Sequence, residues 1–391
     1  MADYAQINDV AAANIAQIND VNYANCAEVN DCTSPSLGAT RWVVGCDDGL
    51  IAHASNSDRT SWTTYDSIST ADVNDNDFDI AFGKDNSGNG IYICTRDGGA
   101  RELQVSGTDV TSTAAWTDIS TNSAAEGGGS TNKKNIMQVL WGARSDGTAS
   151  GTWMAVGHQG DEDIYRSTDG GANWSAIDLS SLSGHDSGVY VNGIASDGAG
   201  KWAFAQANRF YYSTNDGASF AVSTPFSSGQ GKGVPGRIHA IIFTNSSWVI
   251  MYSNSSQVHV RSCAASDVTD WGDEVRLNNL LHMSANNDKG QMAADASGRV
   301  VATTNRNESD LYYFDVNGKV ISGDNSVTLS MSSDGIRDVA TDGSTWLLAC
   351  SDGDVWESTN AGAAWSQIAD EQGGDSSDDF TSVTCDVVLP L

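Results

Sequence analysis

Short apolar runs, bounded by Gly, Ser, Thr, Asp and Asn, recur along most of the chain. Four of them lie within residues 152–156, 200–205, 247–251 and 344–349. Runs of this length with these flanking residues indicate buried β-strands. A further short strand and a turn precede two of the runs, at 194–198 and 339–343. The pattern therefore predicts repeated units of four strands each.

An eight-residue pattern, S-x-[DN]-x-G-x-x-[WF], follows three of these runs. Degenerate copies begin at positions 55, 106, 262 and 314, so the units start roughly 50 residues apart and number seven. The residues that define the three good copies are Ser167, Asp169, Gly171 and Trp174, then Ser213, Asn215, Gly217 and Phe220, and finally Ser358, Asn360, Gly362 and Trp365.

This pattern resembles the Asp-box, or BNR repeat, of sialidase-like β-propellers. The resemblance implies an all-β fold, a seven-bladed β-propeller of four-stranded blades over residues 37–391. The first unit begins abruptly at residues 40–44 without the strand that precedes its siblings, whereas residues 380–388 have the composition of such a strand. An open ring would expose an unpaired edge. We therefore expect the C-terminal strand to complete the first blade and close the ring.

The residues of the boxes have an expected structural role. The Ser and the Asp or Asn can hydrogen-bond to backbone groups of the turn, the Gly can adopt a positive φ, and the Trp can pack between blades. Because Asn replaces Asp in two of the three good copies, a catalytic acid or a calcium ligand at this position is not favoured.

Residues 1–36 form a separate segment with an eleven-residue repeat, whose copies lie at 4–10, 15–21 and 26–32. An eleven-residue period fits a right-handed helical supercoil, whereas the Asn-Asp pair in every copy favours turns, and both conformations remain open. A segment this small cannot build its own core. We expect it to anchor the propeller in a larger assembly; the alternative is that it wraps its own propeller. The units resemble repeats in structural proteins of tailed phages, especially cyanophages, where they precede a larger distal domain.

Charge and cysteine content exclude several function classes. Fifty carboxylates against 20 Lys and Arg give a formal charge of −30, which disfavours binding to nucleic acid or to anionic membranes. No apolar stretch is long enough to cross a membrane, and the first residues lack a signal-peptide pattern. The seven cysteines form no CxxC motif, so buried free thiols are expected rather than a zinc site or a disulfide scaffold. No metal and no cofactor are predicted.

Catalytic motifs are weak. A sialidase would need three convergent arginines, a Tyr–Glu pair and an Asp acid, but the F/Y-R-I-P signature is absent; the nearest match is 236–239. Other glycosidases use two facing carboxylates, and with so many aspartates such a pair could arise anywhere.

The face opposite the boxes is the more favourable place for a ligand. There the turns between the second and third strands of each unit combine carboxylates, amides and Arg, which can hydrogen-bond sugar hydroxyls, although most exposed turns have a similar composition. The candidate binding residues are Asp47, Asp48, His158, Asp161, Arg209, Arg306 and Asp352.

The leading hypothesis is a non-enzymatic virion structural protein, made in the host cytoplasm without a signal peptide. It would be a tail fibre, spike or decoration subunit that is multimeric in the particle, contacts other virion proteins through residues 1–36, and displays the propeller for attachment to host-surface polysaccharide. One alternative is a glycoside hydrolase acting on surface polysaccharide. The other is a cytoplasmic assembly factor, because photosystem assembly proteins have a propeller with similar boxes.

Overall fold

The computed structural model describes strands, turns and two short 3₁₀ helices in the second of the two units into which the chain divides, Thr40–Leu391. The predicted anchor, residues 1–36, lies outside the described residues. No helix among those that are described is both long and apolar enough to cross a bilayer. The described residues are 41–46, 50–66, 79–95, 103–106, 110, 116–118, 135–158, 163–185, 189, 191–226, 237–254, 257–278, 290–304, 309–331, 335–369 and 380–386.

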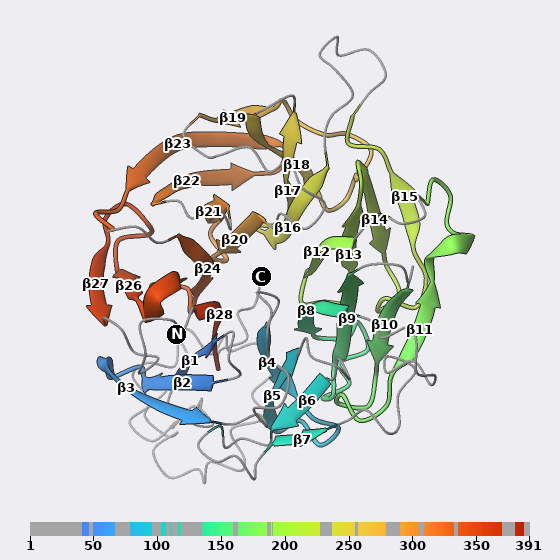
Figure 1. Ribbon diagram of the computed structural model, residues 1–391. Coiled ribbons are helices and arrows are strands. Elements are labelled where there is room, and N and C mark those ends of the chain that lie inside the picture. The colour runs from blue at the N-terminus through green and yellow to red at the C-terminus, as the bar shows by residue number, and fades with distance from the viewer. Residues whose placement is uncertain are drawn as a thin grey trace, which may run out of the picture. The chain divides into compact units, whose positions relative to one another are not determined.

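The strands form antiparallel four-stranded sheets arranged around a common axis (Figure 1). Within six of the sheets the strands follow one another in chain order from the axis outwards. The innermost strand of each sheet contacts the innermost strand of the next sheet, and the last of these strands contacts the first again. The predicted β-propeller with four-stranded blades is therefore confirmed.

The predicted count of seven blades is corrected to six blades of consecutive strands. Six blades are each built from four consecutive strands, and the remaining four-stranded sheet is composite, because it joins β28 to β1–β3 from the other end of the chain. The six continuous blades comprise β4 (Ile80–Lys84), β5 (Gly90–Thr95), β6 (Leu103–Ser106) and β7 (Trp116–Asp118); β8 (Asn135–Gly142), β9 (Thr152–His158), β10 (Asp163–Ser167) and β11 (Ser175–Asp178); β12 (Val191–Ser196), β13 (Trp202–Gln206), β14 (Arg209–Ser213) and β15 (Ala221–Ser223); β16 (Ile238–Thr244), β17 (Ser247–Asn254), β18 (Gln257–Ala264) and β19 (Val275–Leu277); β20 (Gly290–Ala294), β21 (Arg299–Thr304), β22 (Asp310–Asn317) and β23 (Val320–Thr328); and β24 (Ile336–Thr341), β25 (Trp346–Cys350), β26 (Val355–Ser358) and β27 (Ser366–Ala369).

The composite sheet closes the ring. Its strands are β1 (Arg41–Cys46), β2 (Leu50–Ser55), β3 (Asp58–Asp66) and β28 (Phe380–Cys385). β28 pairs with β1 from Trp42↔Cys385 to Cys46↔Phe380, and the backbone N–H of Asp386 donates to the carbonyl of Arg41 at 3.0 Å. The closing strand is thus the predicted one, although it ends at Cys385 rather than at 388.

The core lies between blades rather than within them. A tryptophan in the second strand from the axis is fully buried in five of the sheets, and the apolar clusters around these rings each combine residues of two adjacent sheets. Burial of this much aromatic surface stabilises the ring only when neighbouring blades are both in place. The five tryptophans are Trp42, Trp153, Trp202, Trp248 and Trp346.

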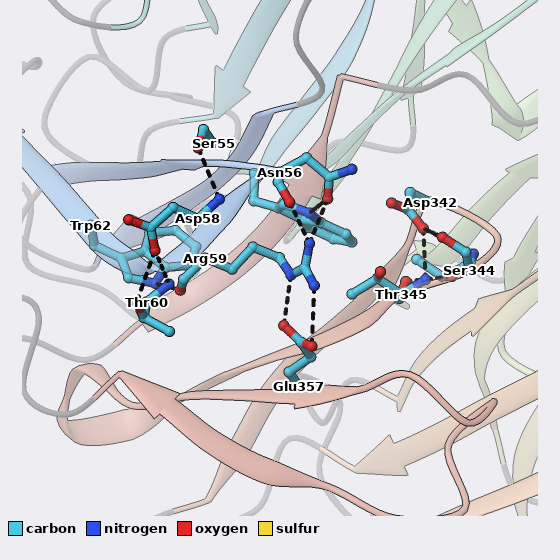
Figure 2. A network of polar contacts seen from close by, with 12 residues as sticks. Ser55, Asn56, Asp58, Arg59, Thr60, Trp62, Asp342, Ser344, Thr345 and Glu357 are labelled. Atoms are coloured by element: carbon cyan, nitrogen blue, oxygen red, sulfur yellow. Dashed lines mark hydrogen bonds and ion pairs between the residues drawn. The ribbon is translucent and has the colours of Figure 1, made fainter.

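A side-chain network reinforces the closing seam (Figure 2). Arg59 of β3 forms a two-pronged ion pair with Glu357 of β26, with Nε 2.6 Å from Oε2 and Nη2 3.2 Å from Oε1. The Arg59 guanidinium also donates to the carbonyl and the side-chain oxygen of Asn56. Planar, two-pronged pairs of this kind fix geometry as well as charge, so the first and last sheets are held at a defined angle.

Candidate functional site

The three good boxes adopt the same hydrogen-bonded turn. In the first, the Ser167 hydroxyl oxygen accepts the Gly171 N–H at 3.0 Å and donates to Asp169 Oδ1 at 2.8 Å. Asp169 Oδ1 also accepts the Asn173 N–H at 3.0 Å, and the Trp174 indole donates to the Gly171 carbonyl at 2.9 Å. Gly171 has φ +85°, a left-handed conformation that costs glycine little.

The other two copies repeat this geometry with Asn in place of Asp. Ser213 and Ser358 accept the N–H of Gly217 and Gly362, in each case at 3.0 Å. Asn215 Oδ1 accepts the Ser219 N–H at 3.1 Å, and Asn360 Oδ1 accepts the Ala364 N–H at 2.9 Å. Gly217 and Gly362 have φ values of +73° and +82°. Trp365 donates to the Gly362 carbonyl, and Phe220 packs edge-on against the ring of Phe204.

The charged carboxylate of Asp169 accepts hydrogen bonds from residues of its own turn. Burial opposes the charged form of this carboxyl, but hydrogen bonds from the Asn173 side chain and backbone and from Ser167 outweigh that cost and lower its pKa. Because an Asn oxygen accepts the same backbone donor in the other two boxes, the position serves the turn in all three. This geometry supplies the structural role expected from the sequence.

Of the candidate binding residues, Arg209 alone has a described side chain. It opens β14 directly after a turn in which Ala207 has φ +54°, it is partly exposed, and it packs close to Gly184. The backbone of His158 ends β9, and the backbone of Asp352 lies in the turn between β25 and β26, but the side chains of both lie outside what the structure describes. The other four candidates lie wholly outside the described residues: Asp47, Asp48, Asp161 and Arg306. Whether these residues bind a ligand therefore stays a prediction.

A central cavity of about 200 Å³ lies at the axis, and sequence reasoning missed it. Its polar lining comes from the first half of the innermost strands or from the residue just before them. Each innermost strand begins at the face of the ring that carries the turns between the second and third strands. The polar lining therefore lies towards that face. The polar lining includes Asp79, Gln138, Asn192, His239, Gln291 and Asp338. These residues are each separated by roughly 50 positions and interrupt otherwise apolar strands, which is the signal that could have identified them.

Two aspartates of this lining are joined through one serine. The Ser382 hydroxyl oxygen lies 2.9 Å from Asp79 Oδ1 and 3.2 Å from Asp338 Oδ2. Burial, together with the nearby charge of Asp79, raises the pKa of Asp338 to about 7. A protonated Asp338 can donate to Ser382 while Ser382 donates to Asp79, so one hydroxyl group can satisfy both carboxyls.

Three of these side chains each connect one blade to the next. Asp79 Oδ2 accepts the Val139 N–H at 2.8 Å, and Gln138 Oε1 accepts the Ile194 N–H at 3.0 Å. Asp338 Oδ2 accepts the Val383 N–H at 2.9 Å. These donors all belong to the innermost strand of the following blade. The channel carboxylates therefore pair backbone groups that would otherwise be buried without partners, and each such pairing avoids a desolvation cost.

Within the part of the chain that the structure describes, no group of three or more His, Cys, Asp or Glu side chains is arranged to hold a metal ion. The aspartate pair is therefore best considered either as a brace or as a pair of carboxyls for acid–base chemistry. The second use requires one acid that is protonated near neutral pH beside another that is charged, and the raised pKa of Asp338 beside Asp79 has that form.

Solved structures similar to this chain share its architecture. The β-propeller domain of Cps50 (Swd1) from Myceliophteria thermophila is 8% identical, with 81% of this chain and 92% of that chain covered and a TM-score of 0.51. Apo AztD from Citrobacter koseri is 10% identical, with coverage of 89% and 98% and a TM-score of 0.50. YCF48 from Cyanidioschyzon merolae is 16% identical, with coverage of 74% and 84% and a TM-score of 0.48.

The chain is a β-propeller. At these identities the shared property is the fold, which hosts many unrelated functions. No protein-family model matches the sequence, and no curated protein sequence matches it. What this propeller does must therefore be argued from its own residues.

Proposed function

We propose that the chain is a non-enzymatic virion structural protein, a tail fibre, spike or decoration subunit, whose propeller attaches the particle to host-surface glycans. The observation that carries this proposal is the use made of the channel carboxylates. All four oxygens of Asp79 and Asp338 accept hydrogen bonds, three of them from backbone N–H groups and the fourth from the Ser382 hydroxyl. Two of the backbone donors, Val139 and Val383, belong to the following blade, so this use of the carboxylates favours a brace between blades over a proton-transfer role.

A rigid ring suits attachment because its turns are already ordered before a ligand arrives. Little conformational entropy is then lost on binding. Contacts with exposed sugar hydroxyls are individually weak, on the order of millimolar. Several copies on one particle would raise the avidity by roughly a hundredfold or more. The predicted anchor, residues 1–36, with its phage-like repeats, supplies the means of multimeric display on other virion proteins.

Binding of multimers to polysaccharide tests the attachment proposal. We expect the purified monomer to bind immobilised bacterial surface polysaccharides poorly and particles or multimers to bind well. Arg209→Ala together with Arg306→Ala should weaken multimer binding without lowering the melting temperature. Arg144→Ala is the matched control, because Arg144 pairs with Asp146 in a turn on the opposite face. If multimers bind no polysaccharide, glycan attachment is wrong.

Truncation tests the structural part of the proposal. A chain that starts at residue 37 should fold but fail to join particles, because the segment that contacts other virion proteins is gone. Normal incorporation of the truncated chain would contradict the anchor.

A glycoside hydrolase is the second candidate. It is favoured by the raised pKa of Asp338, which lies beside Asp79 in the lining of the central cavity. Release of reducing ends from surface polysaccharide, abolished by Asp338→Asn and by Asp79→Asn, would support this candidate against the first. The assembly-factor alternative stays a prediction.

A further inference from the structure

At two seams on the face that carries the boxes, the residue just before the first Ser of a good box contacts the following blade. Arg166 donates from Nε to the carbonyl of Asp216 at 2.7 Å, and Glu357 forms the ion pair with Arg59 (Figure 2). At the Arg166 seam, the Ser145 N–H and hydroxyl also donate to the Asp216 carboxylate at 2.8 Å each. Polar clamps thus occupy these two seams.

The seam between the β12–β15 blade and the β16–β19 blade differs. Tyr212 holds the position of Arg166 and Glu357 there, immediately before Ser213. Beside it lies a crevice of about 230 Å³. Its lining includes Lys201, Tyr212, Thr214, Trp248, Asp267 and Thr269. The degenerate box of the following blade runs from Ser262 to Trp271 and is longer than the good copies, so its turn does not reproduce the clamp.

The β20–β23 blade offers a direct comparison. Lys201 and Arg299 hold the same position in their blades, because Asp197 and Asp295 each accept the N–H of the residue four positions later. The residues two positions after these cations, Ala203 and Val301, each pair with a tyrosine on the next strand. Ala203 pairs with Tyr212, and Val301 pairs with Tyr313.

The two cations nevertheless point to different places. Arg299 lies over the Tyr313 ring at 5.1 Å and forms an ion pair with Asp315 at 2.9 Å. Lys201 instead reaches across the seam, with Nζ 3.4 Å from the Ala265 carbonyl. The Tyr313 ring is therefore covered by its own blade, whereas the Tyr212 ring borders the crevice.

The Tyr212 ring is a rigid wall of this crevice. It stacks on Phe210 with ring centroids 6.5 Å apart, and Phe210 meets Trp248 and Trp271 edge-on at 5.8 and 5.1 Å. Because Phe210 and Trp248 belong to a buried cluster against which Tyr212 and Trp271 pack, the tyrosine needs little further ordering when a ligand packs against it.

The rim supplies hydrogen-bonding groups of both kinds. The Lys201 ammonium is a donor, and the Asp267 carboxylate is an acceptor whose Oδ1 is held by the Thr269 N–H and hydroxyl at 3.0 and 2.6 Å. The hydrogen bonds from Thr269, its side chain first, lower the pKa of Asp267 and keep it charged. An aromatic wall with a few placed polar groups is the usual composition of a small-ligand site.

We propose that this crevice is a saccharide-binding subsite that takes one neutral sugar unit. The C–H face of the ring packs on Tyr212, and neighbouring hydroxyls bond to Lys201 and Asp267, since a hydroxyl both donates and accepts. An anionic ligand meets Asp267 and the charge of −30, and an apolar ligand displaces water from both charged groups without offering them a hydrogen bond in return. The volume is below the roughly 300 Å³ of typical ligand pockets, which limits the subsite to one ring. The inference rests on the proposed glycan attachment but places a contact on the box-bearing face.

Saturation-transfer NMR on the full chain tests the subsite. The probes are the methyl glycosides of D-glucose, D-galactose and D-mannose and free N-acetylglucosamine. At least one should bind with a dissociation constant of about 1–10 mM. Tyr212→Ala should weaken that binding about tenfold or more, and Lys201→Met should also weaken it. Tyr212→Phe should keep affinity within about threefold, because it keeps the ring. Tyr313→Ala, the matched control, should leave affinity unchanged.

Two results overturn the subsite: no probe binds, or Tyr212→Ala and Lys201→Met both bind as well as the unaltered chain. The polysaccharide assay separates this failure from that of the proposed function. If multimers of Tyr212→Ala still bind polysaccharide and lose binding only with the Arg209 and Arg306 substitutions, the attachment stands and the subsite is wrong. If monosaccharides bind through Tyr212 but multimers bind no polysaccharide, the subsite stands and the attachment is wrong.

Discussion

Arg59 and Glu357 are 298 positions apart in the chain, yet they form a two-pronged ion pair across the seam where the ring closes. Their side chains are 21% and 15% exposed. The hydrogen bond that Arg59 donates to Glu357, against the cost of partial burial, raises the pKa of Arg59. The pair joins β3 of the composite sheet to β26 of the last continuous blade, whereas the backbone pairing of β28 with β1 lies within the composite sheet. Two independent sets of contacts therefore join the two ends of the chain.

Removing this pair should destabilise the ring measurably. We expect Arg59→Met to lower the free energy of unfolding by about 1–2 kcal/mol, because Glu357 would keep its charge in a partly buried place without a partner. A double-mutant cycle with Glu357→Gln in urea should give a coupling energy of about 1 kcal/mol that shrinks as salt is added.

The exposed pair Lys319–Asp270, with side chains 53% and 58% exposed, is the matched control. Exposed pairs are screened by solvent, so its cycle should show no measurable coupling. Equal coupling in the two cycles would mean that the Arg59 pair does not lock the seam.

The box serines should matter more than the box acid. Ser167, Ser213 and Ser358 are nearly fully buried and each accepts a Gly N–H. Their replacement by Ala leaves that donor buried without a partner, so each variant should lose about 1–3 kcal/mol. Asp169→Asn should cost no more than about 0.5 kcal/mol, because Asn215 and Asn360 accept the same N–H in their turns. A larger loss for Asp169→Asn than for Ser167→Ala, measured by chemical denaturation, would show that the charge has a role beyond the turn.

The parts of the molecule that local repeats encode could be predicted from the sequence. The boxes predict their own turns because Ser167, Asp169 and Gly171 bond within a few residues of one another. The closing strand could be predicted because the first unit lacks one. By contrast, Asp79 and Ser382 are 303 positions apart and meet only because the ring closes, so no local pattern brings them together.

The crevice was beyond sequence reasoning for a different reason. Lys201 and Arg299 follow similar turns, and only the three-dimensional seam decides that one reaches Ala265 while the other covers Tyr313. Composition suggested exposed turns as binding sites, but composition alone does not show which turn has a rigid aromatic wall beside it.

Stability should depend on pH through Asp338. Its pKa is about 7 in the folded chain and 3.8 as the ordinary value. Between about pH 4 and 7 the folded chain holds a proton that the unfolded chain has released, so this group's contribution to stability is complete at low pH and is lost as pH rises towards 7. Asp386, whose pKa burial raises to about 6, acts in the same direction.

The difference between the unaltered chain and Asp338→Asn isolates this effect. Across pH 4 to 7 the unaltered chain should lose about 3–4 kcal/mol more than the variant, and the two should run parallel above pH 8. Urea denaturation at each pH provides the measurement. If the unaltered chain instead gains stability relative to the variant as pH rises, Asp338 is charged in the fold and the Ser382 bridge is not shared as described.

Moving β28 to the other end of the chain should preserve the ring. Asp386 and Arg41 already bond to each other, the Asp386 N–H to the Arg41 carbonyl at 3.0 Å and the Arg41 N–H to Asp386 Oδ1 at 2.5 Å. A permuted chain in which residues 380–386 precede residues 41–369 through a short Gly-containing turn would make β28 and β1 an ordinary hairpin. We expect it to melt within a few degrees of the parent ring, because every inter-strand and inter-blade contact is retained and connection entropy changes little with loop length.

Deleting residues 380–391 should instead expose the edge of β1 and the buried faces of Val43 and Val44 and give an aggregating protein. Calorimetry of both variants checks this. A deletion variant that melts like the parent would mean that the C-terminal strand does not close the ring.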